Sequence, residues 1–250
     1  MSKLRIALAQ INLTVGDING NVAKVTENLA RARDHQAHIV LFPELTLAGY
    51  PPEDLLLKPG FAAANWSALE SLVPHTRGLT AIVGFVHRQD DLFNAVAVLH
   101  HGQLAGIYHK SLLPNYAVFD EDRYFARGET PLLFTLPAPA LAHPYPVSSG
   151  GEISFGVSVC EDIWYPVGPP EAQAGAGAEL LFEAAAVGDG AVIEQFESNR
   201  SIACSASHAL TESACAERRA NSSTKISAAR HVGSPIGDRL PATRTRAWLG

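Results

Sequence analysis

Large apolar residues become scarce after residue 182 of this 250-residue chain. Valine, isoleucine, leucine, methionine, phenylalanine, tryptophan and tyrosine make up 64 of the first 182 residues but only 12 of the last 68. Burial of such side chains is the main term that offsets the conformational entropy lost on folding. The sequence therefore predicts an ordered domain over residues 1–182 and a low-apolar tail over residues 183–250, which is either disordered or translated out of frame.

The ordered part alternates between short apolar runs and segments with helical periodicity. Strands are predicted at 4–12, 38–45, 80–87, 152–160 and 178–182, helices at 21–36, 61–74 and 169–177, and an antiparallel hairpin at 93–110. The proline-rich stretch 114–147 is expected to be a long loop. Helices that alternate with strands, together with one hairpin, predict an α/β layered fold with mixed strand directions.

Composition and charge exclude several classes of protein. A net charge of -6 argues against a nucleic acid or an anionic membrane as partner, and no apolar run approaches the ~18 residues of a membrane span. Three cysteines do not make a disulfide framework, and no signal-peptide cleavage site follows the N-terminus, so we expect a cytoplasmic location. The ten histidines lack ligand spacing, so we expect no metal site.

Three polar residues stand where predicted apolar strands end. Glu44 follows the run IVLFP, Lys110 follows GIYH, and Cys160 follows FGVSV. Side chains at the ends of different strands can meet at one edge of a sheet, where α/β enzymes often place reactive groups. A cysteine with a carboxylate and an ammonium nearby indicates nucleophilic acyl transfer. The alternative is that these residues are polar only because strands end where the chain meets water.

Longer segments around these residues resemble a known family. FPELTLAGYPPEDLLL (42–57), YHKSLLPNYAVFDEDRYF (108–125) and VCEDIWYP (159–166) are similar, in the same order, to the three catalytic segments of the nitrilase, or carbon–nitrogen hydrolase, superfamily. ALAQINLTVGDINGNVAKV (7–25) and the phrase GYPPEDLLL resemble more specifically the N-terminal glutaminase domain of the glutamine-dependent NAD synthetases. The resemblance covers about residues 3–182. It implies an α/β fold of the nitrilase type, an α-β-β-α sandwich, which we expect to be incomplete at its C-terminal end.

The resemblance also implies a catalytic triad of Glu44, Lys110 and Cys160. In that family the glutamate takes the thiol proton, the cysteine attacks the carboxamide carbon of glutamine, and the lysine with a backbone N–H holds the oxyanion. The glutamate then protonates the departing ammonia and activates the water that hydrolyses the thioester. A buried, inert thiol is the alternative reading of Cys160.

Further residues match the family outside the triad. The resemblance implies that three residues line the glutamine pocket, namely Tyr50, Tyr116 and Glu161, and that Glu121 supports the lysine of the triad. Each of them could instead cap a loop. Asp120, Arg123 and Tyr124 are expected to form a network of ion pairs and hydrogen bonds that fixes their loop.

The resemblance implies that ammonia from glutamine serves the ATP-dependent amidation of deamido-NAD. The ATP and Mg²⁺ of that reaction have no site in this sequence, because SSGG (148–151) is not followed by the rest of an SGGxDS loop, so we expect no cofactor in the chain itself. Glutamine is the expected partner of the chain, and the intact family is expected to form homo-oligomers. Three functions stay open: the glutaminase part of an NAD synthetase, a stand-alone nitrilase-type amidase, and an inactive truncated remnant. A genuine extension is likewise the alternative to an out-of-frame tail.

Overall fold

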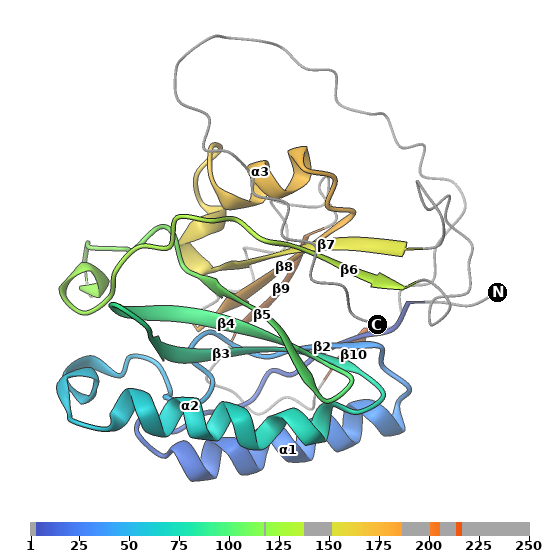
Figure 1. Ribbon diagram of the computed structural model, residues 1–250, viewed down its shortest axis with the longest axis horizontal. Helices are drawn as coiled ribbons and strands as arrows, with labels where there is room; N and C mark the ends of the chain where they lie inside the picture. The colour runs from blue at the N-terminus through green and yellow to red at the C-terminus, as the bar shows by residue number, and fades with distance from the viewer. Residues whose placement is uncertain (1–3, 118, 138–151, 187–200, 206–213, 217–250) are drawn as a thin grey trace, which may run out of the picture.

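Two β-sheets lie face to face between two layers of helix (Figure 1). The computed structural model describes residues 4–117, 119–137, 152–186, 201–205 and 214–216, and all structural statements concern these ranges. The layer order α-β-β-α is the one that the family resemblance implied, and the α/β class is confirmed.

The larger sheet has six strands in the order β10-β1-β2-β3-β4-β5. Its strands are β1 (Ile6–Leu8), β2 (Ile39–Leu41), β3 (Thr80–Arg88), β4 (Leu92–His100), β5 (Gln103–His109) and β10 (Ala214–Ala216). β1, β2 and β3 are mutually parallel, whereas the other pairs are antiparallel. The predicted hairpin is confirmed as β4–β5. It turns at His101 and Gly102, both of which have positive φ, at 48° and 84°.

The smaller sheet has four strands in the order β6-β7-β8-β9. They are β6 (Leu133–Pro137), β7 (Glu152–Val159), β8 (Leu180–Ala185) and β9 (Ser201–Ser205). β6 corrects the prediction of an uninterrupted loop over 114–147. The run is short and ends in proline, which gives little strand signal, but β6 is the edge strand of its sheet, where a proline is tolerated.

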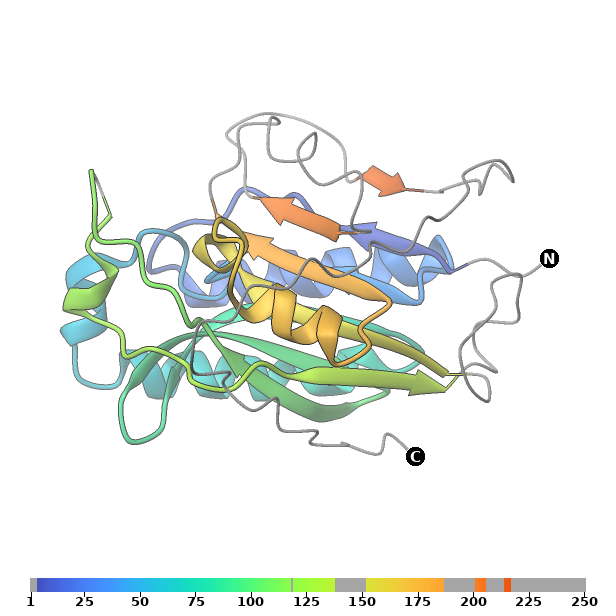
Figure 2. The same cartoon turned by 90° about the horizontal axis from the view of Figure 1, so that it is seen from above.

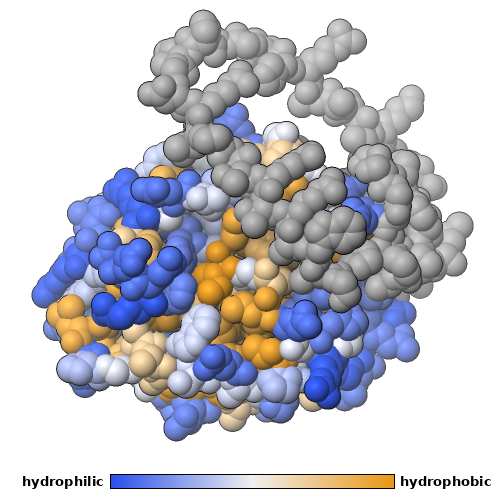
Figure 3. Space-filling model, viewed as in Figure 1, coloured by the Kyte–Doolittle hydropathy of each residue, from blue (hydrophilic) through white to orange (hydrophobic). Residues whose placement is uncertain are grey.

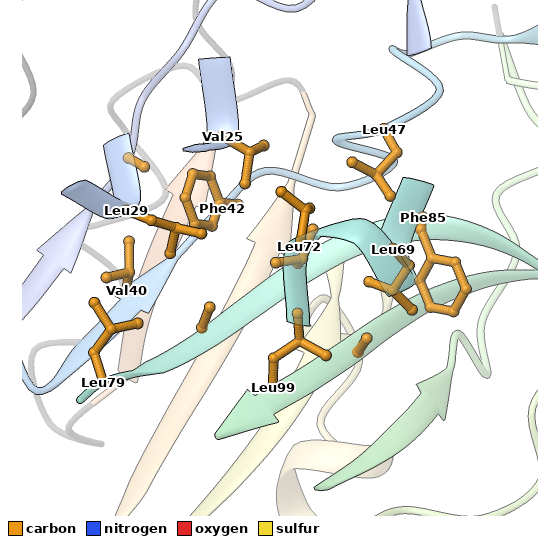
Figure 4. Packing of buried hydrophobic residues seen from close by; sticks show 14 of the residues in the cluster. Val25, Leu29, Val40, Phe42, Leu47, Leu69, Leu72, Leu79, Phe85 and Leu99 are labelled. Carbon is orange, nitrogen blue, oxygen red and sulfur yellow. The ribbon is translucent and has the colours of Figure 1, made fainter. Parts of the chain in front are cut away.

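The helices α1 (Ile18–Asp34) and α2 (Phe61–Leu72) cover the outer face of the six-stranded sheet. Figure 4 shows the apolar side chains between them, with Val25 and Leu29 of α1 and Leu69 and Leu72 of α2 above the strands. Asp17 caps α1 by accepting a hydrogen bond of 3.0 Å from the N–H of Gly20. Burial of this cluster holds the helices on the sheet.

The short helix α3 (Pro169–Gly175) lies against β7 on the outer face of the other sheet (Figure 2). Between the sheets lies a second apolar cluster, to which the larger sheet contributes Ile82 and Tyr108 and the smaller one Phe155, Val159 and Phe182. The two sheets are therefore held together by burial, and the strand ends around this cluster have fixed positions.

Four short 3₁₀ helices complete the described elements: η1 (Glu53–Leu57), η2 (Val73–Thr76), η3 (Glu121–Arg123) and η5 (Cys160–Ile163). On the face shown in Figure 3, apolar residues gather in the middle, where strands of both sheets lie in Figure 1. Within the described ranges, every helix is too short or too polar to cross a membrane.

The predicted division at residues 182 and 183 is not visible as a break in the backbone. β8 runs through it to Ala185, β9 continues the same sheet, and β10 pairs with β1. The rest of the 183–250 segment lies outside the described residues. The domain division and the disorder of the tail therefore stay predictions.

Candidate active site

The three predicted catalytic residues each follow the C-terminal end of a strand. Glu44 lies three residues after β2, Lys110 directly follows β5, and Cys160 directly follows β7 as the first residue of η5. β2 and β5 belong to one sheet and β7 to the other. Face-to-face packing of the sheets brings these strand ends to one place.

Glu44 and Lys110 form a buried ion pair. The Lys110 Nζ lies 2.7 Å from Glu44 Oε1, and both side chains are fully inaccessible to solvent. Nζ also lies 3.0 Å from each carboxylate oxygen of Glu121. Burial lowers the pKa of Lys110, but the two carboxylates outweigh that effect and raise the pKa well above its ordinary value. Lys110 is therefore an ammonium ion at neutral pH.

Asn94, which the sequence did not single out, holds both carboxylates. Its Nδ2 donates to Glu44 Oε1 at 2.7 Å and to Glu121 Oε2 at 3.3 Å. The side chain is buried and its Oδ1 has no partner among the described residues. The available signal was one amide inside the apolar strand LFNAVAV, because a buried polar side chain requires a partner.

The backbone of Ala186, just past β8, provides the remaining contact to Glu44. Its N–H donates to Glu44 Oε2 at 3.2 Å. Glu44 Oε1 already accepts from Lys110 and Asn94, so Oε2 is the oxygen with more free accepting capacity. No side-chain pattern in the sequence could have indicated this contact.

Glu121 lies beside the lysine, as the family resemblance implied. It also accepts a hydrogen bond of 3.1 Å from the hydroxyl of Tyr50. Burial and the neighbouring Glu44 carboxylate raise the pKa of Glu121 to about 7, against the opposing effect of Lys110. Glu121 thus exchanges its proton near neutral pH.

Cys160 sits at a strained turn between β7 and η5. Its φ of 44° falls in the left-handed region, which is unfavourable for a residue with a Cβ, and its side chain is partly exposed. Burial and the charge of Glu44 raise the pKa of the Cys160 thiol well above its ordinary value, whereas Lys110 lowers it. The resting thiol is protonated, so nucleophilic attack requires a base in the same site.

The segment that carries Glu44 is also pressed closely onto β3. Leu45 has a φ of 45°, and the N–H of Leu47 donates to the carbonyl of Gly84 at 3.2 Å. A Cβ at Gly84 would collide with the backbone of Pro43 and Leu45. Glycine at this position is required by that close approach, which fixes the height of Glu44 above the sheet.

Tyr116 and Glu161, two of the predicted pocket residues, are brought together at the surface beside Cys160. The Tyr116 hydroxyl donates to Glu161 Oε2 at 2.9 Å, and this hydrogen bond raises the pKa of Tyr116 to about 12. Tyr116 is exposed while Glu161 is buried. Tyr50, the third predicted pocket residue, is bonded to Glu121 instead. Their role in a glutamine pocket stays a prediction.

The loop network expected around η3 is present and includes one further residue. Arg123 lies 3.9 Å from Asp120 and 3.8 Å from Asp54, and the hydroxyl of Tyr124 donates to Asp54 at 2.8 Å. These contacts are exposed, so they fix the loop only weakly. The described residues contain no group of three or more histidine, cysteine, aspartate or glutamate side chains arranged to hold a metal ion.

An α-β-β-α sandwich with a buried Glu–Lys pair at its strand ends, beside a cysteine at a strained turn, defines a nitrilase-type protein. The sequence profile described as carbon-nitrogen hydrolase matches residues 5–215. The chain belongs to this family. The match extends past residue 182, where the resemblance drawn from the sequence segments ended.

Curated relatives that match the chain are much longer than it is. The glutamine-dependent NAD(+) synthetase of Aquifex aeolicus is 45% identical over 180 residues, which are 71% of this chain and 29% of the relative. That of Thermotoga maritima is 42% identical over 184 residues, which are 72% of this chain and 30% of the relative. The chain thus corresponds to less than a third of these proteins.

Solved structures agree on the fold. The glutamine-dependent NAD+ synthetase of Acinetobacter baumannii, in complex with adenosine diphosphate, aligns with a TM-score of 0.64 at 32% identity, over 74% of this chain and 32% of that one. An amidase of the nitrilase superfamily from Nesterenkonia AN1 aligns with a TM-score of 0.68 at 22% identity, over 82% of this chain and 76% of that one. The second likeness shows the fold alone.

Proposed function

We propose that this chain is a glutaminase, which hydrolyses the side-chain carboxamide of glutamine through a thioester on Cys160. The observation that carries the proposal is the buried contact of 2.7 Å between Glu44 and Lys110, beside a cysteine whose pKa both residues influence. A carboxylate and an ammonium ion thus lie beside a thiol, which supports their roles as base, cation and nucleophile. The relatives named as glutamine-dependent NAD synthetases favour glutamine as the substrate.

In the first half of the reaction, Glu44 accepts the proton of the Cys160 thiol while the sulfur attacks the carboxamide carbon. We assign the accepting atom as Oε2, because Oε1 already receives hydrogen bonds from Lys110 and Asn94. The oxyanion of the tetrahedral intermediate is stabilised by the Lys110 ammonium and by a backbone N–H after Cys160. The C–N bond then breaks, and Glu44 returns its proton to the departing ammonia.

In the second half, Glu44 takes a proton from water, whose oxygen attacks the thioester carbonyl. The C–S bond breaks, the sulfur recovers a proton from Glu44, and glutamate leaves. One carboxyl group serves as base and acid in turn. Glu121 stays bonded to Lys110 throughout and holds the ammonium in place.

Within a longer protein, the released ammonia would serve the amidation of deamido-NAD. We include in the proposal that ATP and Mg²⁺ are bound by parts of the relatives that this chain does not span, that the chain binds no cofactor of its own, and that the protein works in the cytoplasm as a homo-oligomer. The support is the family resemblance and the share of the relatives that the chain covers, 29% and 30%.

The test is to purify the 250-residue chain and to measure glutamate and ammonia released from glutamine, with simple aliphatic amides as competing substrates. We expect release from glutamine that is lost in Cys160→Ala and in Glu44→Gln. Cys215→Ala on β10 and Glu129→Gln on the surface are matched controls that should stay active. Faster hydrolysis of the aliphatic amides would identify an amidase instead. No hydrolysis of any amide by the folded chain would contradict the proposal.

A further inference from the structure

Asp162 is a buried carboxylate with no direct role in the reaction described above. It lies in η5, two residues after Cys160, and its side chain is fully buried. None of its hydrogen bonds within the described residues goes to an amine or a guanidinium group. Burial raises its pKa to about 6, although four hydrogen-bond donors favour the charged form. Burial of a carboxylate without a cation costs folding free energy, which indicates that its hydrogen bonds have a role in the protein.

All four donors come from the chain segments that carry Lys110 and Cys160. Oδ1 accepts from the N–H of Ser111 at 3.1 Å and of Leu112 at 2.8 Å, directly after Lys110. Oδ2 accepts from the hydroxyl of Tyr108 at 2.7 Å, two residues before Lys110. The strand end that presents Lys110 is therefore bound to this one carboxylate from both sides.

The fourth donor belongs to the segment that presents the cysteine. The N–H of Val159 donates to Asp162 Oδ2 at 3.0 Å, directly before Cys160. Cys160 itself has a φ of 44°, a conformation that persists only where its surroundings hold it. The bond from Val159 back to Asp162 closes the turn around the cysteine and supplies that support.

β5 and β7 belong to different sheets, and no backbone ladder joins these sheets in the part of the chain that the structure describes. We infer that Asp162 is a positioning residue, whose carboxylate ties the end of β5 to the end of β7 and thereby sets the separation between the Lys110 ammonium and the Cys160 thiol. This inference rests on the proposed function, in which Lys110 stabilises the oxyanion formed by attack of Cys160. Asp162 does not touch the substrate.

The substitution Asp162→Asn keeps the size of the side chain, but whichever oxygen is replaced, the new amide N–H₂ faces at least one backbone N–H, which can only donate. We expect kcat for glutamine hydrolysis to fall about 100-fold, the usual cost of displacing a reacting group by about 1 Å, while KM changes little. Tyr108→Phe removes one of the four donors and should lower kcat in the same direction by a smaller factor. The surface pair Tyr124 and Asp54 offers matched controls, Tyr124→Phe and Asp54→Asn, that should leave kcat unchanged.

A second measurement keeps the inference testable if the chain hydrolyses no glutamine. The rate at which iodoacetamide alkylates Cys160 is followed by peptide mass spectrometry, with Cys204 and Cys215 as internal references. Loss of the hydrogen bonds to Asp162 should expose Cys160 and move it away from Glu44. Burial and the Glu44 charge are the two main causes of the raised pKa of Cys160. Its alkylation should therefore become several-fold faster in Asp162→Asn and in Tyr108→Phe. The reference cysteines should react as in the unmodified chain.

The outcomes separate the two claims. If the chain has no glutaminase activity, and Asp162→Asn speeds the alkylation of Cys160 but not that of Cys204 and Cys215, the positioning role is supported and the proposed function is contradicted. Unchanged kcat and unchanged Cys160 alkylation in folded Asp162→Asn would overturn the positioning role and leave the proposed function standing. If Asp162→Asn does not fold, the same two readouts on Tyr108→Phe decide, and unchanged values there overturn the inference.

Discussion

Replacement of Glu121 by glutamine is expected to remove a pH-dependent part of the protein's stability. Burial and the Glu44 carboxylate raise the pKa of Glu121 from 4.5 to about 7 in the folded protein. In the unfolded chain Glu121 loses its proton near its ordinary pKa of 4.5, whereas in the folded chain it keeps the proton up to about pH 7. The stability that the protonated group contributes is therefore fully present below about pH 4.5 and is lost as the pH rises to about 7.

The size of the effect follows from the two pKa values. A difference of about 2.5 units, at 1.36 kcal/mol per unit, corresponds to about 3 kcal/mol of unfolding free energy lost across this interval. Glutamine at position 121 does not titrate. Its oxygen can accept from Lys110 and Asn94 and its amide can donate to the Tyr50 hydroxyl, but this amide also lies against the Lys110 ammonium. That repulsion lowers the stability of the variant by an amount that does not change with pH, so the pH dependence of the difference is kept.

The assay is urea unfolding of both chains at intervals between about pH 4 and pH 8, followed by tryptophan fluorescence. The stability of Glu121→Gln relative to the unmodified chain should rise by about 3 kcal/mol across this range. Asp162, whose pKa is raised to about 6, titrates in both proteins and cancels in the difference. Glu70→Gln on the exposed face of α2 is the control. A difference that stays constant with pH, or that changes in the opposite direction, would refute the argument.

Three further substitutions test the packing around Glu44. Lys110→Met leaves two buried carboxylates without their cation and should cost about 3–5 kcal/mol of unfolding free energy in urea, so a variant of unchanged stability would disprove the ion pair. Gly84→Ala should push the Glu44 segment off β3 and cost about 1–3 kcal/mol together with glutaminase activity, whereas Gly175→Ala, where a Cβ meets nothing within 4 Å, should be tolerated. Asn94→Leu takes one donor from each carboxylate and should cost about 1.5–3 kcal/mol and slow glutamate release, and retention of both properties would show that its hydrogen bonds are dispensable.

The amino-acid sequence by itself determined the helices, most of the strands and the hairpin, because each depends on a local pattern. The spacing of apolar residues over 21–36 and 61–74 predicted α1 and α2 to within a few residues, and the turn at His101-Gly102 predicted the hairpin β4–β5. The strand β6 escaped prediction because its signal is its pairing with β7, which lies beyond a proline-rich stretch. β9 and β10 escaped it too, because the segment after residue 182 has few large apolar residues. Polar residues at strand ends identified Glu44, Lys110 and Cys160 as candidates.

Only the tertiary structure decided which groups surround those candidates. Asn94 reaches Glu44 across 50 residues of sequence, Tyr108 reaches Asp162 across 54, and the N–H of Ala186 reaches Glu44 across 142. The last contact also comes from beyond residue 182, where the loss of apolar side chains had suggested that the ordered domain ends. A backbone N–H has the same chemistry at every position except proline, so no residue type marks the one that donates to Glu44. The Ala186 N–H reaches Glu44 because the two sheets pack together and bring the end of β8 close to the end of β2.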